Sequence, residues 1–208
     1  MAKSRDKIQQ LGFWDPEVSN PDHDDICLWA YHNAHDIFQT VVPSLFNRDW
    51  DQSEILISHE ERTPETIRAV EQYTKATPRP NPRVVGRSLE HVLKSSTGYR
   101  NNLERIVGYA DLHIRTSVPL ITSVQGNKTR LGFNVLEEFE VNWSEERYPG
   151  ILVEAKSVLP TIGELMRQIQ LYRTAFGGPI VVISPDTKYA EILREQEVAF
   201  IQYAPDRA

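Results

Sequence analysis

The chain has 208 residues, of which 40% are hydrophobic and 25% charged, a composition that fits one globular domain with or without a smaller N-terminal elaboration. Its single cysteine, Cys27, excludes a disulfide framework and a cysteine-ligated zinc or iron–sulfur cluster. The net charge of −6 argues against a protein that coats nucleic acid through a basic excess, but not against a nuclease, since a metal site concentrates carboxylates.

The chain begins with a polar segment, residues 1–10, that lacks the apolar stretch of a secretion signal. No apolar run approaches the roughly 20 residues that a membrane-spanning helix requires. We therefore expect a cytoplasmic protein that does not contact membranes.

Helices dominate the expected structure of the N-terminal part. Apolar residues at helical spacing predict a helix over residues 24–42, which Pro43 ends, and Cys27 is expected to be a small buried apolar residue of that helix. Residues 54–58 are expected to form a short strand. A second helix is predicted over residues 63–75, where Thr is a favourable cap and Pro a favourable first residue.

A proline-rich stretch, residues 77–83, separates this part from the rest of the chain. Its three prolines in five positions resist both helix and sheet, which indicates a surface connector. We expect a mainly helical N-terminal elaboration over residues 1–80 and the main domain over residues 81–208.

The next segment predicts a helix and then strands. One helix face, rather than strand alternation, is indicated by the spacing of Val85, Leu89, Val92 and Leu93. Residues 105–115 predict a strand. Residues 117–124 and 131–141 predict further strands or a long hairpin insertion, with a turn at Gly126-Asn127.

The remainder of the chain alternates strands and helices. Strands are expected over residues 150–156, 179–184 and 199–203, and helices over residues 162–176 and 188–196. Thr161 and Glu164 have the spacing of a capping box, and Gly177-Gly178 is expected to end the first of these helices in left-handed backbone. The elements together predict an α/β fold, a mixed central sheet flanked by helices.

Charged residues occur where these strands should be buried. Glu154 and Lys156 share one strand face at the end of an apolar run, and Asp111 lies within another apolar strand. Buried charges are costly unless they pair or bind a metal, and two carboxylates from adjacent strands can converge on Mg²⁺. Each residue alone also fits a structural role, as a strand end or an Asp satisfied by backbone donors.

Two polar residues follow on the next helix. Gln168 and Tyr172 are four residues apart, so they lie on one face and can look into the same cleft if the helix packs back on the sheet. In isolation this pair also fits the solvent face of an amphipathic helix.

The order of these residues resembles the PD-(D/E)xK nuclease superfamily, in particular its branch of RecB-type nucleases and lambda exonuclease. The resembling segments are Gly108-Tyr109-Ala110-Asp111-Leu112, then Val153-Glu154-Ala155-Lys156, then Gln168-Ile169-Gln170-Leu171-Tyr172. The resemblance covers residues 84–203 and implies a restriction-endonuclease-like sheet. Its departures are Ala110 where relatives often have Pro, a long gap before Glu154, and the absence of the cysteines that some relatives carry.

The resemblance also implies roles. Asp111, Glu154 and the carbonyl of Ala155 would bind Mg²⁺ or Mn²⁺, while Lys156 would position or help deprotonate the attacking water. Gln168 and Tyr172 would orient Lys156 and the scissile phosphate.

Relatives usually have a helical Glu upstream of the first acid. Glu90 is our choice, and a solvated surface Glu is the alternative reading. If its segment is a strand, Glu65 or Glu71 on the earlier helix would become the candidates.

Other polar groups have less specific patterns. Arg167 and Arg173 flank the Gln168–Tyr172 pair and could hold phosphates, or serve solubility. Pro185-Asp186-Thr187-Lys188 spells a PD-x-K-like string, which we interpret as a turn and helix cap. An acidic, His-rich patch is formed by His23, Asp24, Asp25, His32, His35 and Asp36. Within it, His32 and Asp36 could bind a metal but fit a solvated helix face better.

We therefore expect a Mg²⁺-dependent deoxyribonuclease, acting as an endonuclease or exonuclease, as a homodimer or within a larger nuclease complex. One alternative is an inactive nucleic-acid or protein binding module on the same fold, such as a subunit of a mobile-element or defence complex. A third hypothesis is a metal-binding regulator that uses His32 and His35.

Overall fold

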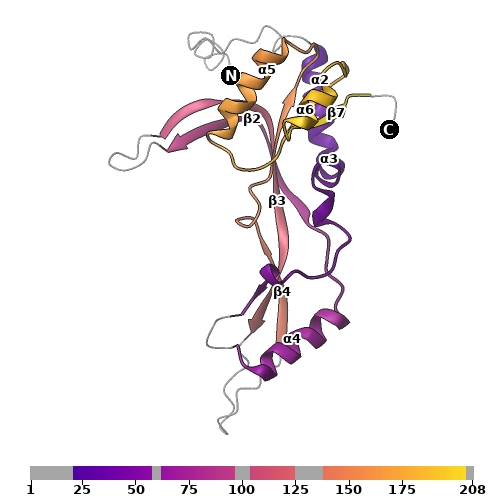
Figure 1. Ribbon diagram of the computed structural model, residues 1–208, viewed down its shortest axis with the longest axis vertical. Coiled ribbons are helices and arrows are strands. Elements are labelled where there is room, and N and C mark those ends of the chain that lie inside the picture. Colours follow the sequence, from indigo (N-terminus) through magenta and orange to yellow (C-terminus); the bar gives the residue numbers. More distant parts are fainter. Residues whose placement is uncertain (1–20, 58–61, 97–103, 125–137, 205–208) are drawn as a thin grey trace. The chain divides into compact units, whose positions relative to one another are not determined.

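The computed structural model describes residues 21–57, 62–96, 104–124 and 138–204 (Figure 1). Contacts within the chain define two units. Unit 1 contains residues 1–41, 84–115 and 149–208, and unit 2 contains residues 42–83 and 116–148. Of the separate elaboration expected over residues 1–80, residues 21–41 therefore belong to the same unit as the C-terminal strands, whereas residues 42–80 belong to unit 2.

Unit 1 begins with two consecutive helices, α2 (Pro21–His32) and α3 (Ala34–Val41). The helix predicted over residues 24–42 is confirmed in position but interrupted at Asn33. There the Asn33 side chain donates to the Trp29 carbonyl at 2.8 Å, and such local bonds compete with the helical ladder. The second helix ends at Val41, before Pro43, as predicted.

The segment after the connector is a strand, β2 (Arg83–Ser96), which pairs with the long strand β3 (Glu104–Val124). The helix predicted here is wrong. Glu90 has a φ of +49°, so the backbone turns within the strand and strict alternation of faces is lost. The resulting apolar spacing imitates a helix, and pairing with β3 decides the structure.

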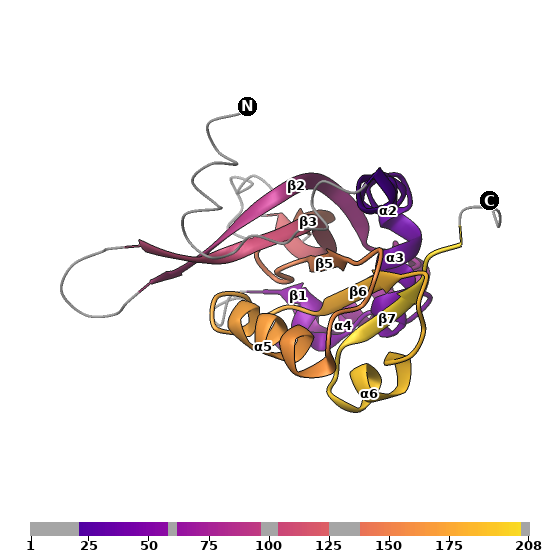
Figure 2. The ribbon, with the colours of Figure 1, turned by 90° about the horizontal axis from the view of Figure 1, so that it is seen from above.

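The centre of unit 1 is formed by β5 (Ile151–Ala155), β6 (Ile180–Ser184) and β7 (Ala199–Gln202). These strands are parallel to one another, and β5 is antiparallel to β3. Every residue of β5 and β6 is buried, because both faces are covered. Figure 2 shows α2 and α5 on opposite sides of β5.

The connections between the parallel strands are the helices α5 (Ile162–Arg173) and α6 (Ala190–Glu195). The predicted capping box of Thr161 and Glu164 is confirmed. The predicted glycine ending is wrong: α5 ends at Arg173, and neither Gly177 nor Gly178 has a positive φ. The Thr174 amide instead bonds to carbonyls of the last turn, which tightens the helix end.

The core of unit 1 lies between α5, α6 and the sheet. Apolar side chains from both layers fill it, and its members include Leu152, Leu165, Ile169, Tyr172, Val182 and Leu193. This core fixes α5 against β5 and so positions the helix face that carries Gln168.

Unit 2 contains the helix α4 (Pro64–Ala76), capped by Thr63 as predicted, the short strand β1 (Ile55–Leu56) and the strand β4 (Glu138–Ser144). Two single 3-10 turns, Pro43–Leu45 and Gln52–Glu54, precede β1. The far half of β3 pairs with β4 in antiparallel register, which confirms the hairpin insertion. The turn at Gly126-Asn127 and residues 131–137 lie outside the described residues.

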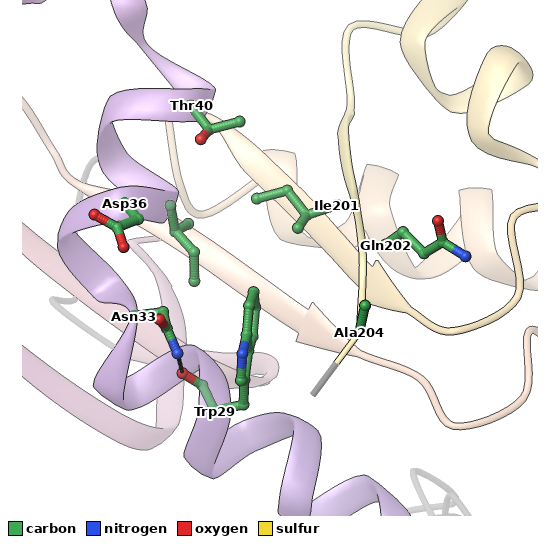
Figure 3. Close-up of a pocket in the computed structure, with 8 residues that line it drawn as sticks. Trp29, Asn33, Asp36, Thr40, Ile201, Gln202 and Ala204 are labelled. Carbon is green, nitrogen blue, oxygen red and sulfur yellow. Dashed lines mark hydrogen bonds between the residues drawn. The ribbon is translucent and has the colours of Figure 1, made fainter. Parts of the chain in front are cut away.

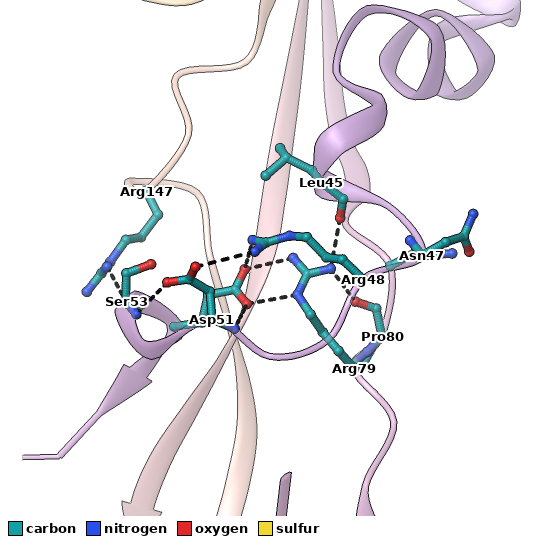
Figure 4. Close-up of polar contacts among 10 residues, drawn as sticks. Leu45, Asn47, Arg48, Asp51, Ser53, Arg79, Pro80 and Arg147 are labelled. Atoms are coloured by element: carbon teal, nitrogen blue, oxygen red, sulfur yellow. Dashed lines mark hydrogen bonds and ion pairs between the residues drawn. The ribbon is translucent and has the colours of Figure 1, made fainter. Parts of the chain in front are cut away.

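A buried ion-pair cluster anchors unit 2 (Figure 4). The Glu54 carboxylate accepts two bonds from Arg79, at 2.8 and 2.9 Å, and one from Arg48 at 2.6 Å. Arg79, whose side chain is fully buried, also donates to the Leu45 carbonyl at 2.8 Å. The cluster holds the proline-rich connector against the turn before β1.

The seven strands of both units form one mixed sheet, because β3 pairs in both. This confirms the α/β class with a mixed sheet and flanking helices. Within the part of the chain that the structure describes, none of the helices has the length and apolar character that crossing a membrane would require.

Candidate active site

The site begins at the end of β5, where two charges are buried side by side. The Glu154 and Lys156 side chains are 2% and 3% exposed, and Lys156 Nζ lies 2.9 Å from Glu154 Oε1. The Lys156 amide donates to the Ile183 carbonyl, which extends the β5–β6 pairing past the last residue of the strand. Because desolvation of such a pair is costly, additional hydrogen bonds must complete it.

The α5 helix supplies those bonds. Gln168 Nε2 lies 2.6 Å from Glu154 Oε1 and 2.7 Å from the Tyr172 hydroxyl. The Tyr172 hydroxyl lies 2.5 Å from the Tyr109 carbonyl and 2.9 Å from Glu154 Oε2, so its single proton can serve one of these two acceptors at a time. The predicted shared face of Gln168 and Tyr172 therefore points at Glu154, not at solvent.

Asp111 lies beside this group on β3. The pairing of β3 with β5 ends at Leu112 and Val153, and beyond it Asp111 Oδ2 accepts the Ala155 amide at 2.7 Å. The carboxylate thus replaces a main-chain partner where the two strands separate. Its side chain is 19% exposed, so it is the part of the group that a ligand can reach.

The structure also brings α2 to Asp111. His23 Nε2 lies 3.5 Å from Asp111 Oδ1, and His23 is 5% exposed. Cys27, one turn later on α2, places its Sγ 3.8 Å from His23 Nδ1. The imidazole nitrogen, thiol sulfur and Asp111 oxygen all lie within 4.8 Å of one another, a spacing that could hold a metal ion.

Burial and charge shift the ionisation of these groups. Burial, followed by the nearby Asp111 charge, raises the pKa of Glu154 to about 7, while Lys156 and the Tyr172 hydrogen bond oppose the rise. Hydrogen bonding to Asp111 raises the pKa of His23 to about 11. Burial raises the pKa of the Cys27 thiol and of the Tyr172 hydroxyl. In the metal-free protein at neutral pH, His23 is therefore protonated.

The donor set fits a divalent cation. Asp111 and Glu154 are carboxylates from the adjacent strands β3 and β5. His23 adds a nitrogen, which suits Mn²⁺ or a later transition ion better than Mg²⁺. Lys156 and protonated His23 are the cations that face the carboxylates in the metal-free protein.

The other predicted site residues lie elsewhere. Glu90 is exposed on a strand, so its expected place on a helix is wrong. The alternatives Glu65 and Glu71 are exposed on α4 in unit 2. Arg167 is exposed, whereas Arg173 donates to the carbonyls of Gln196 and Glu197 and so closes the end of α6.

The PD-x-K-like string and the His32–Asp36 pair have the ordinary structures of a turn and an exposed helix face. Asp186 accepts the Lys188 amide at 3.0 Å, which confirms the turn, but Tyr189 precedes α6 without a side-chain cap. His32 and Asp36 are both exposed. His35 pairs loosely with Asp36, at 3.7 Å.

Sequence reasoning missed the proximity of His23 and Cys27 to Asp111. His23 was grouped with a solvated patch, and Cys27 was expected to be buried among apolar residues. The available signal was their spacing of four residues, which puts both on one helix face, but no local pattern says which strand that face meets.

A pocket of about 280 Å³ lies between the α2–α3 pair and β7 (Figure 3). Trp29, Asn33 and Thr40 line one side and Ile201 and Gln202 the other. None of the residues predicted for catalysis lines it, so we place the candidate site at Glu154 and Asp111, where buried charged groups converge, and not at this pocket.

Comparison with protein-family models, with curated proteins and with solved structures found no match for this chain. What the chain is proposed to do therefore rests on its own residues and their geometry.

Proposed function

We propose that this protein is a metal-dependent nuclease that hydrolyses phosphodiester bonds in DNA, in the manner of the RecB-type branch of the PD-(D/E)xK superfamily. One observation carries the proposal: Glu154 is buried and bonded at once to Lys156, Gln168 and Tyr172. The resemblance groups five residues by their order in the sequence. Four of them, Glu154, Lys156, Gln168 and Tyr172, form a single hydrogen-bonded network. The fifth, Asp111, accepts a hydrogen bond from the end of the same strand.

The organisation of the network supports the proposal. Gln168 and Tyr172 hold the Glu154 carboxylate in one orientation, and Lys156 keeps a positive charge at the same carboxylate. Preorganised charge of this kind needs no rearrangement when negative charge develops on the phosphate. Asp111 is the partly exposed carboxylate of the group, so an incoming cation would meet it first.

A divalent cation bound by Asp111, Glu154 and the Ala155 carbonyl, with His23 as a further donor, would neutralise phosphate charge and lower the pKa of a bound water. Lys156 would then orient the attacking water, and Gln168 would hold Lys156 and Glu154 in their relative positions. Arg167, exposed on the same helix, would contact phosphates outside the scissile bond.

The test is cleavage of single-stranded, linear double-stranded and supercoiled DNA by the full chain with Mg²⁺ or Mn²⁺. Lys156→Met removes the charge and keeps an unbranched side chain in the buried site. We expect its rate to fall by at least about 100-fold, the scale for losing one transition-state donor. EDTA should abolish cleavage by the wild type.

Lys75→Met is the matched control, since Lys75 is exposed on α4 in unit 2. It should cleave like the wild type. Thermal unfolding of each variant separates loss of chemistry from loss of fold. Cleavage that survives Lys156→Met, or a folded wild type that cleaves none of the substrates with either metal, would overturn the proposal.

A second candidate is a binding module without catalysis on the same scaffold. The near-complete burial of both Glu154 and Lys156 favours it, because a closed ion pair can serve structure alone. This candidate predicts DNA or protein binding that divalent ions and Lys156→Met leave unchanged, together with no cleavage.

A further inference from the structure

In the cluster formed by His23, Cys27 and Asp111, the Cys27 thiol has a chemistry that the proposed nuclease does not use. His23 and Cys27 lie one helical turn apart on α2, so both side chains project from one face of that helix. Asp111 enters the cluster from β3. Transition metal sites are commonly built from two donors one turn apart on a helix and a third donor from another element.

The separations of the donor atoms agree with that use. Donors around a tetrahedral Zn²⁺, with bonds of about 2.0–2.3 Å, stand roughly 3.3–3.8 Å apart. Here His23 Nε2 lies 3.5 Å from Asp111 Oδ1, and Cys27 Sγ lies 3.8 and 3.9 Å from the two ring nitrogens. All three donor atoms lie within 4.8 Å of one another.

The types of donor decide which ion. Thiolate sulfur is a soft ligand that Mg²⁺ avoids, and imidazole suits zinc-class ions. The cysteine count led us to exclude cysteine-ligated zinc, and it does exclude a multi-cysteine cluster, but Cys27 can still supply one of three protein ligands. Three protein ligands leave a fourth position open to solvent or to a substrate group.

We propose that His23, Cys27 and Asp111 form a binding site for a thiolate-preferring transition metal ion of the Zn²⁺ class. The site shares Asp111 with the proposed nuclease centre but does not rest on nuclease activity. Because both sites use the Asp111 carboxylate, binding of the zinc-class ion should weaken the binding of Mg²⁺ there.

Co²⁺ is a suitable probe, since a thiolate bonded to Co²⁺ gives a charge-transfer absorption band in the near ultraviolet. Cys27 is the only cysteine, so any such band in the untagged full chain reports on this residue. We expect the band to reach its maximum at one Co²⁺ per chain and to disappear when Zn²⁺ is added.

Three variants test the ligand set. Cys27→Ser should abolish the band, while His23→Gln and Asp111→Asn should weaken Co²⁺ and Zn²⁺ binding by more than about tenfold, since even indirect partners of a metal commonly contribute 10–100-fold. The double variant of His32→Gln and His35→Gln is the matched control, because these exposed histidines lie on the same pair of helices. It should bind like the wild type.

A folded wild type without a thiolate band would overturn the proposal, whether or not the protein cleaves DNA. So would a band that forms at one Co²⁺ per two chains, or one that His23→Gln and Asp111→Asn leave unchanged. A normal band in a protein that shows no cleavage would support this site and contradict only the nuclease.

Discussion

Glu154 has an environment far from that of an ordinary, solvated carboxylate. Burial and the Asp111 charge raise its pKa from 4.5 to about 7. Because the folded-state pKa is the higher one, the folded protein binds this proton more tightly than the unfolded chain. The corresponding stability is fully present below pH 4.5 and is lost as the pH rises through 7.

We therefore predict that the melting temperature of the metal-free protein in EDTA falls between pH 4.5 and 7, and that Glu154→Gln removes most of this fall. His23, with its pKa raised to about 11, adds a separate loss above pH 6.5 that Glu154→Gln should leave in place. Calorimetry of both proteins across this range makes the comparison, with Glu191→Gln, an exposed change on α6, as the control. Parallel curves for wild type and Glu154→Gln would contradict the assignment.

Glu54 is the corresponding buried acid of unit 2, and its role is structural. Replacing it by Gln leaves the fully buried Arg79 without its counter-charge. We expect Glu54→Gln to lower the free energy of unfolding by about 3 kcal/mol, the scale for breaking one side of a buried ion pair. Urea denaturation measures the change.

Glu71→Gln is the comparison for Glu54→Gln, because Glu71 is exposed on α4 of the same unit. A surface substitution of this kind should remain within about 0.5 kcal/mol of the wild type. Equal effects of the two variants would show that the cluster of Glu54, Arg48 and Arg79 contributes little.

Among the elements, β5 depends on the glycine that precedes it. Gly150 has a φ of +91°, and a Cβ there would collide with the Ile114 carbonyl oxygen and lie 2.9 Å from His113 Nε2. The close approach lets β5 start directly beside β3. An alanine at this position would strain the backbone and push the two strands apart.

We predict that Gly150→Ala costs at least about 2 kcal/mol of unfolding free energy, combining left-handed strain with the collision. Gly177→Ala is the matched control, because no atom lies within 4 Å of its added Cβ and its φ is not positive. It should be neutral or slightly stabilising. Chemical denaturation of both variants decides between this account and one in which any glycine near α5 is equally sensitive.

The elements also separate what local sequence can predict from what it cannot. The capping box at Thr161 and the cap at Thr63 are confirmed because the cap bonds join residues three apart. The helix predicted over β2 failed because its pairing partner, β3, and the backbone turn at Glu90 are not visible in local spacing.

For the whole molecule, metal binding should appear as added stability. An ion that binds only the folded state stabilises it by about 2.7 kcal/mol at one hundred times its dissociation constant. We predict that saturating Mn²⁺ raises the melting temperature of the full chain, and that Asp111→Asn abolishes most of the rise. Differential scanning fluorimetry with an EDTA reference measures it.

Asp186→Asn provides the control for that experiment, because Asp186 belongs to the other PD-x-K-like string, at a turn before α6. It should show the same Mn²⁺-induced rise as the wild type. If Asp111→Asn keeps the rise in melting temperature and Asp186→Asn loses it, the ion binds at the turn before α6, which contradicts the proposed site.

The sequence by itself determined the α/β class, most strands and helices, and the identity of Asp111, Glu154, Lys156, Gln168 and Tyr172 as residues of interest. It could do so because strand alternation, helical spacing and capping depend on neighbours a few residues apart. The remaining contacts join residues that are far apart in the sequence, so only the tertiary structure decided them. Packing of α2 beside β3 brings His23 and Cys27 to Asp111 across more than 80 residues of chain, and no local pattern encodes that distance.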